Sequence, residues 1–419
     1  MNRIFKTMML SVAILTSFSA FAQTKVNEST TVYELSNSKL HVFQTGDPLG
    51  DVSFIIEGEK GLVILEQPLF YESIAAFDSY VQSLNKPIDK VIANYHQGGL
   101  SNYPSKKIMM PEAMIQFGKG EVYSGIMAKF SKAFGDTADL QAVTKAKSFT
   151  VPSSQNWVGV EFEFSNGSET DFPAASILID NSAFYTHFAP SKSHASTMLL
   201  DSPAAVDAMI TELTKIKNSG AKYIFGSHGL PATMEDVEFN LEYMLKVKEL
   251  LASCANSDIF GQRLMVAYPK INGVELIKPL AKALYPNEVV DADTKAVRER
   301  MDDYLNVVSN LDMTLARELW AEGDNISIIA PRNQFFGFDG ITKDFLLKAF
   351  SSFKSRKLSS LSEVINVYGN SANVQLYWQF DTVDAKGVAH QGRGRESLIF
   401  EKLNGVWKLV HVHYSPMPL

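Results

Sequence analysis

Three histidines in this 419-residue chain lie where strand-like segments run into polar loops. His96 ends the segment IDKVIANYH, His187 lies near the end of ASILIDNSAFYTHF, and His228 follows AKYIFGS in a Gly/His loop. Three imidazoles with one open coordination position form a catalytic type of zinc site. A zinc ion held in this way lowers the pKa of a bound water to near 7 and polarises a substrate carbonyl. These residues are therefore a candidate ligand set for one zinc ion.

A second group of polar side chains lies near the C-terminus, on predicted strands. Strand parity places Val374, Leu376, Trp378 and Phe380 on one face, which we interpret as core, and Tyr377 on the other. A final hairpin that turns at Asn404-Gly405 would align the strands that follow. The polar side chains that we expect to share one surface are Arg395, His411 and His413.

A guanidinium beside two imidazoles suits an anionic or carbonyl-bearing ligand. We expect this surface to face a cavity that also contains an aromatic side chain, Tyr377 or Trp407. The alternative is a hydrogen-bonded sheet face at a dimer contact. Metal chelation by the two histidines is disfavoured because no carboxylate cluster lies nearby in the sequence. Asp324 and Asp339 lie at predicted turns, and neither is an obvious catalytic base.

Composition and length limit the classes of protein to consider. A chain of 419 residues with 46% hydrophobic and 20% charged residues is typical of a globular protein of two domains or more. The net charge of −7 argues against a nucleic-acid partner. Residues 1–22 combine a basic start, an apolar stretch and the cleavage pattern Ala20-Phe21-Ala22, which predicts a signal peptide. No later segment reaches transmembrane length.

The predicted signal and the cysteine count indicate the compartment. Cys254 is the only cysteine, so an internal disulfide is excluded, and we interpret it as a buried structural residue on a helix. A cleavable signal without disulfides suits a bacterial periplasmic or secreted protein.

The pattern of elements changes near residue 290. Before it, strand-like segments such as KLHVFQT and VSFIIEGEKGLVILE alternate with helical spacing at 70–84, 114–134, 203–218 and 234–254, which predicts a layered α/β domain. The polar segment NEVVDADTKA is a predicted linker. A long helix over 297–319 and a set of strands follow it, which is an α+β pattern. The predicted domains are therefore 23–290 and 297–419, with the boundary between 285 and 298.

The first domain resembles the metallo-β-lactamase fold family over roughly residues 37–288, by the order of its landmarks. The segment VILEQP places Glu66 where the family has aspartate, and Ala93-Asn94-Tyr95-His96-Gln97-Gly98-Gly99 is similar to the family's T-H-x-H-x-D-H loop, of which only His96 is retained. Thr186-His187 and Gly226-Ser227-His228-Gly229 are similar to two later ligand loops, and His194 matches a further family histidine. The resemblance implies an αββα sandwich in which the loops of His96, His187 and His228 converge.

The resemblance also implies an eroded metal centre. The intact loop supplies most ligands of two zinc ions, whereas here Asn94 and Gly99 replace histidines and Gly98 replaces the aspartate. A two-metal hydrolase is therefore disfavoured, and one zinc ion on the three histidines is the remaining metal hypothesis. Asn94, Glu169 or Asp171 could add an oxygen ligand. The competing interpretation is that the histidines are relics satisfied by hydrogen bonds.

Residues 297–419 resemble the SnoaL-like branch of the nuclear-transport-factor-2-like superfamily. The resemblance rests on ELWAEGDNISIIAP, GFDGI and the ending GRESLIFEKLNGVWKLVHVHYSPMP. It implies a cone of curved sheet wrapped by helices, with a cavity for a small ligand, and a dimer contact through the sheet. The function that we expect is small-molecule binding by an exported, dimeric two-domain protein. The alternative is a single-zinc hydrolase that uses His96, His187 and His228.

Overall fold

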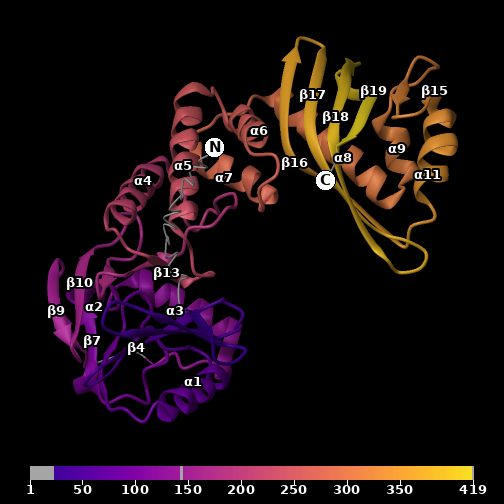
Figure 1. The fold of residues 1–419 in the computed structure, drawn as a ribbon. Coiled ribbons are helices and arrows are strands. Elements are labelled where there is room, and N and C mark those ends of the chain that lie inside the picture. The colour runs from indigo at the N-terminus through magenta and orange to yellow at the C-terminus, as the bar shows by residue number, and fades with distance from the viewer. Residues whose placement is uncertain (1–22, 142–144, 418–419) are drawn as a thin grey trace, which may run out of the picture. The chain divides into compact units, whose positions relative to one another are not determined.

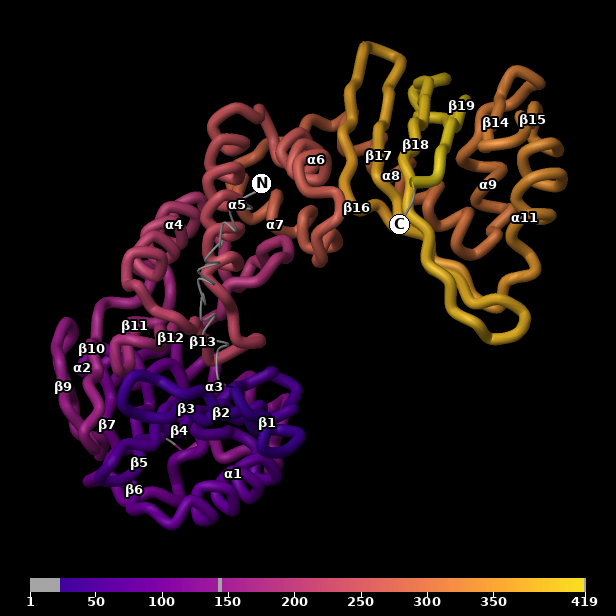
Figure 2. Tube along the Cα trace, viewed as in Figure 1, coloured from indigo at the N-terminus to yellow at the C-terminus, as the bar shows by residue number. Residues whose placement is uncertain are grey.

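The computed structural model describes residues 23–141 and 145–417 and divides them into two compact units. The first unit consists of three stretches, namely the described residues up to Gly167, Phe172–Ala189 and Ser219–Thr233. The second unit consists of Ser168–Asp171, Pro190–Asn218 and the chain from Met234 onward. Figures 1 and 2 trace the elements of each unit. The predicted signal peptide lies outside the described residues. Within them, no helix is both long enough and apolar enough to span a membrane.

The first unit contains an eight-stranded sheet whose strands follow chain order. Pairing is antiparallel from the first to the fifth strand and parallel from the fifth to the eighth. The expected strands around the Glu59-Lys60 turn are confirmed. The strands are β1 (Gln23–Lys25), β2 (Thr30–Glu34), β3 (Lys39–Gln44), β4 (Val52–Gly58), β5 (Gly61–Leu65), β6 (Ile88–Ile92), β7 (Ile108–Pro111) and β8 (Lys147–Phe149).

A second sheet of the same unit has the order β13-β12-β11-β10-β9, with β12 and β13 parallel and the other pairs antiparallel. Apolar side chains of both sheets, such as Phe54 and Phe225, form one core between them. The strands are β9 (Ser153–Trp157), β10 (Val160–Asn166), β11 (Ala175–Ile179), β12 (Ala183–Phe188) and β13 (Tyr223–His228). The unit is thus a two-sheet α/β sandwich.

Helices of the first unit follow the predicted spacing with one correction. Helix α1 (Tyr71–Ser83) packs Phe77 and Val81 into the core, as predicted for 70–84. The single helix expected over 114–134 is wrong, because the chain forms α2 (Glu112–Phe117) and α3 (Glu121–Phe134). Glycines 118 and 120 separate the two and weaken a continuous helix. Two 3₁₀ turns complete the set, η1 (Ser105–Lys107) and η2 (Gly135–Thr137).

The second unit begins with helices. They are α4 (Pro203–Asn218), α5 (Met234–Ser253), α6 (Ser257–Ala267), η3 (Val274–Leu276) and α7 (Ile277–Leu284). Of these, α4 and α5 confirm the helical spacing predicted for 203–218 and 234–254. Cys254 directly follows α5 and is buried, as expected of a structural cysteine.

A six-stranded curved sheet forms the rest of this unit, in the order β15-β14-β19-β18-β17-β16. Its elements are α8 (Ala292–Asn310), α9 (Met313–Leu319), β14 (Ser327–Ile329), β15 (Gln334–Phe336), the helical run α10 (Gly337–Asp339), η4 (Gly340–Leu347) and α11 (Lys348–Phe350), then β16 (Ser355–Tyr368), β17 (Ser371–Val383), β18 (Ala389–Leu403) and β19 (Val406–Met417). Helix α8 packs its apolar side against the sheet, which gives the expected cone (Figure 1).

Two sequence expectations for this region need correction. The predicted linker is half helical, because Asp291 accepts a hydrogen bond from Thr294 N and starts α8 at Ala292. The long helix expected over 297–319 breaks at Leu311, whose φ of 55° is left-handed, and Asp312 caps the new helix α9. Both changes are local effects of aspartate caps.

Buried charges join α6 and α7 to the cone. Arg298 of α8 donates to Asp258 of α6 at 2.7 Å and also to Glu363 of β16. Lys278 of α7 lies 2.8 Å from the same Glu363 carboxylate. These contacts explain why the compact unit begins before residue 290. The predicted sequence boundary between 285 and 298 stays a prediction about independently folding domains.

Candidate functional sites

The three candidate zinc ligands lie together in the first unit. One ring nitrogen from each of His96, His187 and His228 falls within 4.8 Å of the others. The Nε2 atoms of His96 and His228 are 3.2 Å apart. Two nitrogens bound to one tetrahedral zinc at about 2.0–2.1 Å lie about 3.3 Å apart. The spacing of His96 and His228 therefore matches that of two ligands on one zinc ion, and His187 lies close by as the candidate third ligand.

Carboxylates lie behind two of these imidazoles. Asp51 Oδ1 is 3.2 Å from His228 Nδ1, and Glu66 Oε2 is 3.6 Å from His96 Nδ1. The Nε2 atoms that face each other are thus the ring atoms remote from the carboxylates. A carboxylate behind a histidine is the arrangement that orients metal-bound imidazoles in proteins. Asp51, which directly follows a glycine-containing turn, was not predicted as a site residue from the sequence.

Glu66 organises the loop that carries His96. Its carboxylate accepts the backbone N–H of Tyr95 at 2.6 Å and of His96 at 3.1 Å, and the hydroxyl of Tyr185 at 2.7 Å. Burial raises the pKa of Glu66 to about 7 and that of Asp51 to about 8. Burial and the two neighbouring imidazoles hold the pKa of His96 well below its ordinary value. A neutral His96 ring is the form that binds metals.

The third histidine is held by an aromatic ring. His187 stacks on Tyr95, with ring centroids 4.3 Å apart and planes 6° apart. Its side chain is nearly buried, whereas the rings of His96 and His228 are about one fifth exposed. The cluster thus opens to solvent on the side of His96 and His228.

The loop between β6 and β7 has no room for the missing ligands. A Cβ on Gly99, whose φ is +74°, would lie 2.0 Å from the carbonyl oxygen of Pro68. A Cβ on Gly98 would lie 2.2 Å from Leu69 Cδ1. The Pro68 backbone closes over Gly99 and the Leu69 side chain closes over Gly98, so an aspartate or histidine at either position requires these neighbours to move. In this conformation of the loop, neither position can carry a metal-ligating side chain.

Asn94, one of the proposed oxygen ligands, is engaged elsewhere. Asn94 is fully buried, donates to Ala175 O at 2.7 Å and accepts from Ala175 N at 3.0 Å, so it ties β6 to β11. Glu169 is exposed. His194 lies in the second unit, where it bonds the Tyr243 hydroxyl and the Tyr268 carbonyl, and burial lowers its pKa to about 4. Asn94 and His194 therefore have structural roles.

In the second unit, the predicted polar surface is only partly assembled. Arg395, Tyr377 and His413 line one groove, together with Gln262 and Val266 of α6. His411 instead bonds Ser327 of β14 at 2.9 Å. Trp407 is buried in the core, and its Nε1 donates to Asp293. Neither of these two residues lines the groove.

A β-bulge decides which side chains share this surface. Phe400 pairs with Leu409, but Ile399 pairs with His411, so Val410 is the extra residue. Beyond the bulge, Ser397 pairs with His413 and Arg395 pairs with Ser415. Before the bulge, Trp407 and Leu409 point into the core. Without the bulge, every later side chain of β19 would exchange faces.

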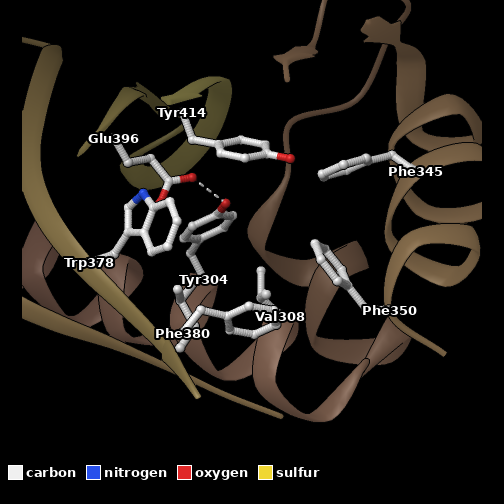
Figure 3. A pocket seen from close by; sticks show the side chains of 9 residues that line it. Tyr304, Val308, Phe345, Phe350, Trp378, Phe380, Glu396 and Tyr414 are labelled. Carbon is white, nitrogen blue, oxygen red and sulfur yellow. Dashed lines mark hydrogen bonds between the residues drawn. The ribbon is translucent and has the colours of Figure 1, made fainter. Parts of the chain in front are cut away.

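A different cavity lies inside the cone, on the opposite face of the same strands. It measures about 440 Å³, counting its open mouth. Figure 3 shows that its wall is largely aromatic, with Glu396 as the single carboxylate among the labelled side chains. The lining residues are Tyr304, Val308, Phe345, Phe350, Leu358, Trp378, Phe380, Glu396 and Tyr414. The predicted polar surface therefore faces the outer groove and not this cavity.

Glu396 is the chemically distinctive residue of the cone cavity. It is 5% exposed, and its Oε1 accepts the Tyr304 hydroxyl at 2.6 Å (Figure 3). Burial raises its pKa to about 8, so the carboxyl is mostly neutral at pH 7. The buried indole Nε1 of Trp378 has no hydrogen-bond partner among the residues that the structure describes. A sequence pattern could have indicated this site. Glu396 alternates with Leu398 and Phe400 along the strand, so its carboxyl lies on the apolar face.

Comparison with known proteins places the C-terminal region in a family. A family model for the SnoaL-like domain matches residues 297–419. Among solved structures, a nuclear transport factor 2-like superfamily protein from Salmonella enterica is 31% identical over 30% of this chain and 92% of its own, with a TM-score of 0.29. The association domain of CaMKII from C. elegans is 20% identical over 30% and 95%, with a TM-score of 0.25. A cystatin-like-fold protein from Nostoc punctiforme is 16% identical over 31% and 96%, with a TM-score of 0.27.

The comparison with curated protein sequences gave no match. Residues 297–419 are a SnoaL-like domain with the cone fold. The family match does not extend to the first unit, and the metallo-β-lactamase resemblance of that unit stays a hypothesis.

Proposed function

We propose that the SnoaL-like domain binds a compact, uncharged and largely apolar molecule in its cone cavity. The observation that carries this proposal is the buried Glu396 at the end of an aromatic cavity. Because the carboxyl is mostly neutral at pH 7, it offers a donor to a ligand oxygen while Tyr304 holds its other oxygen. Trp378 adds an N–H that has no partner within the described chain. A carbonyl or hydroxyl group on an apolar body would satisfy these groups.

The charge of the residues that line the cone cavity argues for a neutral ligand. An anion would meet a carboxyl group that becomes negative above about pH 8, and the cavity lining includes no cationic side chain among the described residues. An ammonium ligand would require Glu396 to ionise in an apolar site, which costs free energy. Neutral molecules avoid both penalties.

Titration of the full chain with acetophenone, followed by calorimetry, tests the proposal. We expect saturable binding that Glu396→Leu weakens about 5- to 10-fold, since one hydrogen bond is lost. Tyr377→Phe is the matched control, because Tyr377 lies on the opposite face of β17. Benzylamine, which carries an ammonium on a similar frame, should bind more weakly. Tighter binding of benzylamine, or equal losses in both variants, would contradict the proposal.

We propose as a second candidate function that the first unit is a single-metal hydrolase of the metallo-β-lactamase fold. The convergence of His96, His187 and His228, with carboxylates behind two of the rings, supports it. A zinc ion there would act as a Lewis acid and supply a hydroxide-like water. The three imidazoles would hold the ion, and Asp51 and Glu66 would fix the ring orientation of His228 and His96.

Metal content tests this candidate without an assay for activity. Protein purified without chelators, or reloaded with zinc, should hold one zinc ion per chain, and His96→Ala should lose it. His194→Ala is the control, since His194 is bonded by Tyr243 outside the cluster. Zinc content that is substoichiometric after reloading, or unchanged in His96→Ala, would leave the histidines as structural residues.

Two further properties are proposed from the sequence. The first is export with cleavage after Ala22, for which N-terminal sequencing of the mature protein is the test. The second is a homodimer through the SnoaL-like domain, which light scattering of the purified chain at several concentrations would detect. A mature chain that starts at Met1, or a monomer at all concentrations, would contradict them.

A further inference from the structure

A groove lies on the outer face of the cone sheet, separate from the cone cavity. It measures about 720 Å³, counting open space, and we call it the outer groove. Its floor is the sheet face that carries Tyr377, Arg395 and His413, and one wall is helix α6 with Gln262 and Val266. Helix α6 precedes the SnoaL-like domain in the chain, so the domain alone does not complete this groove.

The floor of the outer groove holds a cation that is not neutralised. Across the described residues, Arg395 has no carboxylate within ion-pair distance, and its guanidinium lies over the Tyr377 ring at 5.6 Å. Arg393, two residues earlier on the same face, instead bonds Gln379 Oε1 at 3.1 Å. Stacking on a ring leaves the edge N–H groups of a guanidinium available for a planar anion.

The pairing of neighbouring strands places further hydrogen-bond donors around the Arg395 guanidinium. Arg395 pairs directly with Ser415 on one side and with Tyr377 on the other, and Ser397 pairs with His413. Residues opposite each other on one sheet face have Cβ atoms about 4.5–5.5 Å apart. Two hydroxyls and an imidazole therefore lie within reach of an anion held by Arg395. Glu396 does not oppose this charge, because its carboxyl is bonded to Tyr304 on the other face.

Helix α6 supplies an apolar wall in a fixed position. Gln262 Nε2 donates to the Gln375 carbonyl at 3.3 Å, and Asp258 is held by Arg298 at 2.7 Å. Val266 is 62% exposed on this wall, facing a groove that also contains the Tyr377 ring. An apolar group placed between Val266 and Tyr377 would cover both. The groove thus combines an anion position with an apolar slot.

We propose that the outer groove binds an organic carboxylate whose apolar body lies between Tyr377 and Val266. The carboxylate is held by the Arg395 guanidinium and by the hydroxyls of Ser397 and Ser415. This second ligand site does not depend on the cone cavity, from which it is separated by the sheet itself. A carboxylate is favoured over inorganic phosphate because phosphate leaves the apolar slot unfilled.

Calorimetric titration of the full chain with benzoate tests the proposal. We expect saturable binding that Arg395→Gln weakens at least 10-fold and that Val266→Ser weakens about 3-fold. Arg393→Gln is the matched control and should change the affinity less than 2-fold, since this neighbouring arginine is already bonded to Gln379. Inorganic phosphate should bind more weakly than benzoate and should not respond to Val266→Ser.

Several results would overturn the proposal. Benzoate binding that is insensitive to Arg395→Gln, or that is lost in Glu396→Leu, would place the anion elsewhere. Phosphate binding as tight as that of benzoate would indicate a general anion site. A dimer that dissociates in Arg395→Gln, with no benzoate effect, would make this face an interface. Acetophenone binding is measured in the same variants, so that failure of the cone-cavity proposal can be distinguished from failure of the outer-groove proposal.

Discussion

Arg395 and Glu396 are consecutive residues of β18 whose side chains serve opposite faces of one sheet. Arg395 lies exposed in the outer groove beside Tyr377, and Glu396 is buried in the cone cavity with its carboxyl bonded to Tyr304. Alternation along a strand places the guanidinium and the carboxyl group on opposite sides of the sheet. The two proposed ligand sites therefore share a strand and can still be changed independently.

Replacing Glu396 by glutamine should flatten the pH dependence of stability. Burial raises the folded-state pKa to about 8, whereas the ordinary value is 4.5. The stabilisation from the protonated carboxyl is complete below about pH 4.5 and is lost as pH rises to about 8, because the unfolded chain releases its proton first. We expect wild type to lose about 2–5 kcal/mol more than Glu396→Gln over this window.

Urea unfolding at pH 5 and pH 8.5 measures this difference. Glu401→Gln is the control, since Glu401 lies exposed on the same strand. Equal pH dependence in wild type and Glu396→Gln would show that Glu396 ionises normally in the folded protein.

Asp51→Asn should weaken zinc binding while the three imidazoles remain. The Asp51 carboxyl group lies 3.2 Å from His228 Nδ1, so its replacement removes the oxygen that orients the ring. Removal of such a partner costs about 10- to 100-fold in metal affinity. Competition with a chromophoric chelator measures the affinity, and the exposed Asp136→Asn serves as control. Unchanged affinity in Asp51→Asn would separate this carboxylate from the metal.

Gly99→Ala should destabilise the first unit by about 2–4 kcal/mol, because the new Cβ meets the Pro68 carbonyl at 2.0 Å and φ is +74°. Gly46→Ala is a matched control, since Gly46 has a similar φ of +69° and open space around its Cβ position. That control should cost about 1 kcal/mol from backbone strain alone. Thermal unfolding compares the two variants. Equal losses of stability in the two variants would mean that the close approach of the Pro68 carbonyl to Gly99 adds nothing to the cost of backbone strain.

Arg298→Met should destabilise the second unit and weaken benzoate binding together. The variant leaves the buried Glu363 with Lys278 as its remaining cation and the Ser360 hydroxyl as a donor, and it releases Asp258 of α6. Loss of one partner of a largely buried pair costs about 2–4 kcal/mol. Arg300→Met is the control, because Arg300 pairs with Asp303 nearer the surface and should cost less than about 1 kcal/mol. Full benzoate affinity in Arg298→Met would show that α6 is not held in place by this pair.

Local patterns in the sequence predicted most elements well. Helical spacing located α4 and α5, and alternation located the strands of the cone. The turn at Asn404-Gly405 is confirmed, because both residues have the positive φ that such a hairpin requires. Errors occurred where a single residue acts locally, as at Leu311, whose left-handed conformation ends a helix inside a continuous apolar spacing.

The candidate sites were predictable only in part, because they depend on contacts between distant segments. The sequence by itself determined that three imidazoles lie at or shortly after the ends of three strands, and that positions 98 and 99 are glycines and carry no ligand. It did not indicate that Asp51 lies behind His228, a contact between residues 177 positions apart in the chain. Such contacts follow from sheet order, which short-range patterns do not specify.

In the cone, the sequence indicated which residues of each strand share a face, but it did not indicate how neighbouring strands align. The extra residue at Val410 exchanges the faces of every residue that follows it, and so places His413 beside Ser397 and Arg395. Curvature of the sheet then encloses Glu396 with Tyr304 and Trp378. Sequence determined which residues alternate, because side-chain direction is a local property of the backbone. Only tertiary structure decided which face became a cavity, because register and curvature are set by packing against α6 and α8.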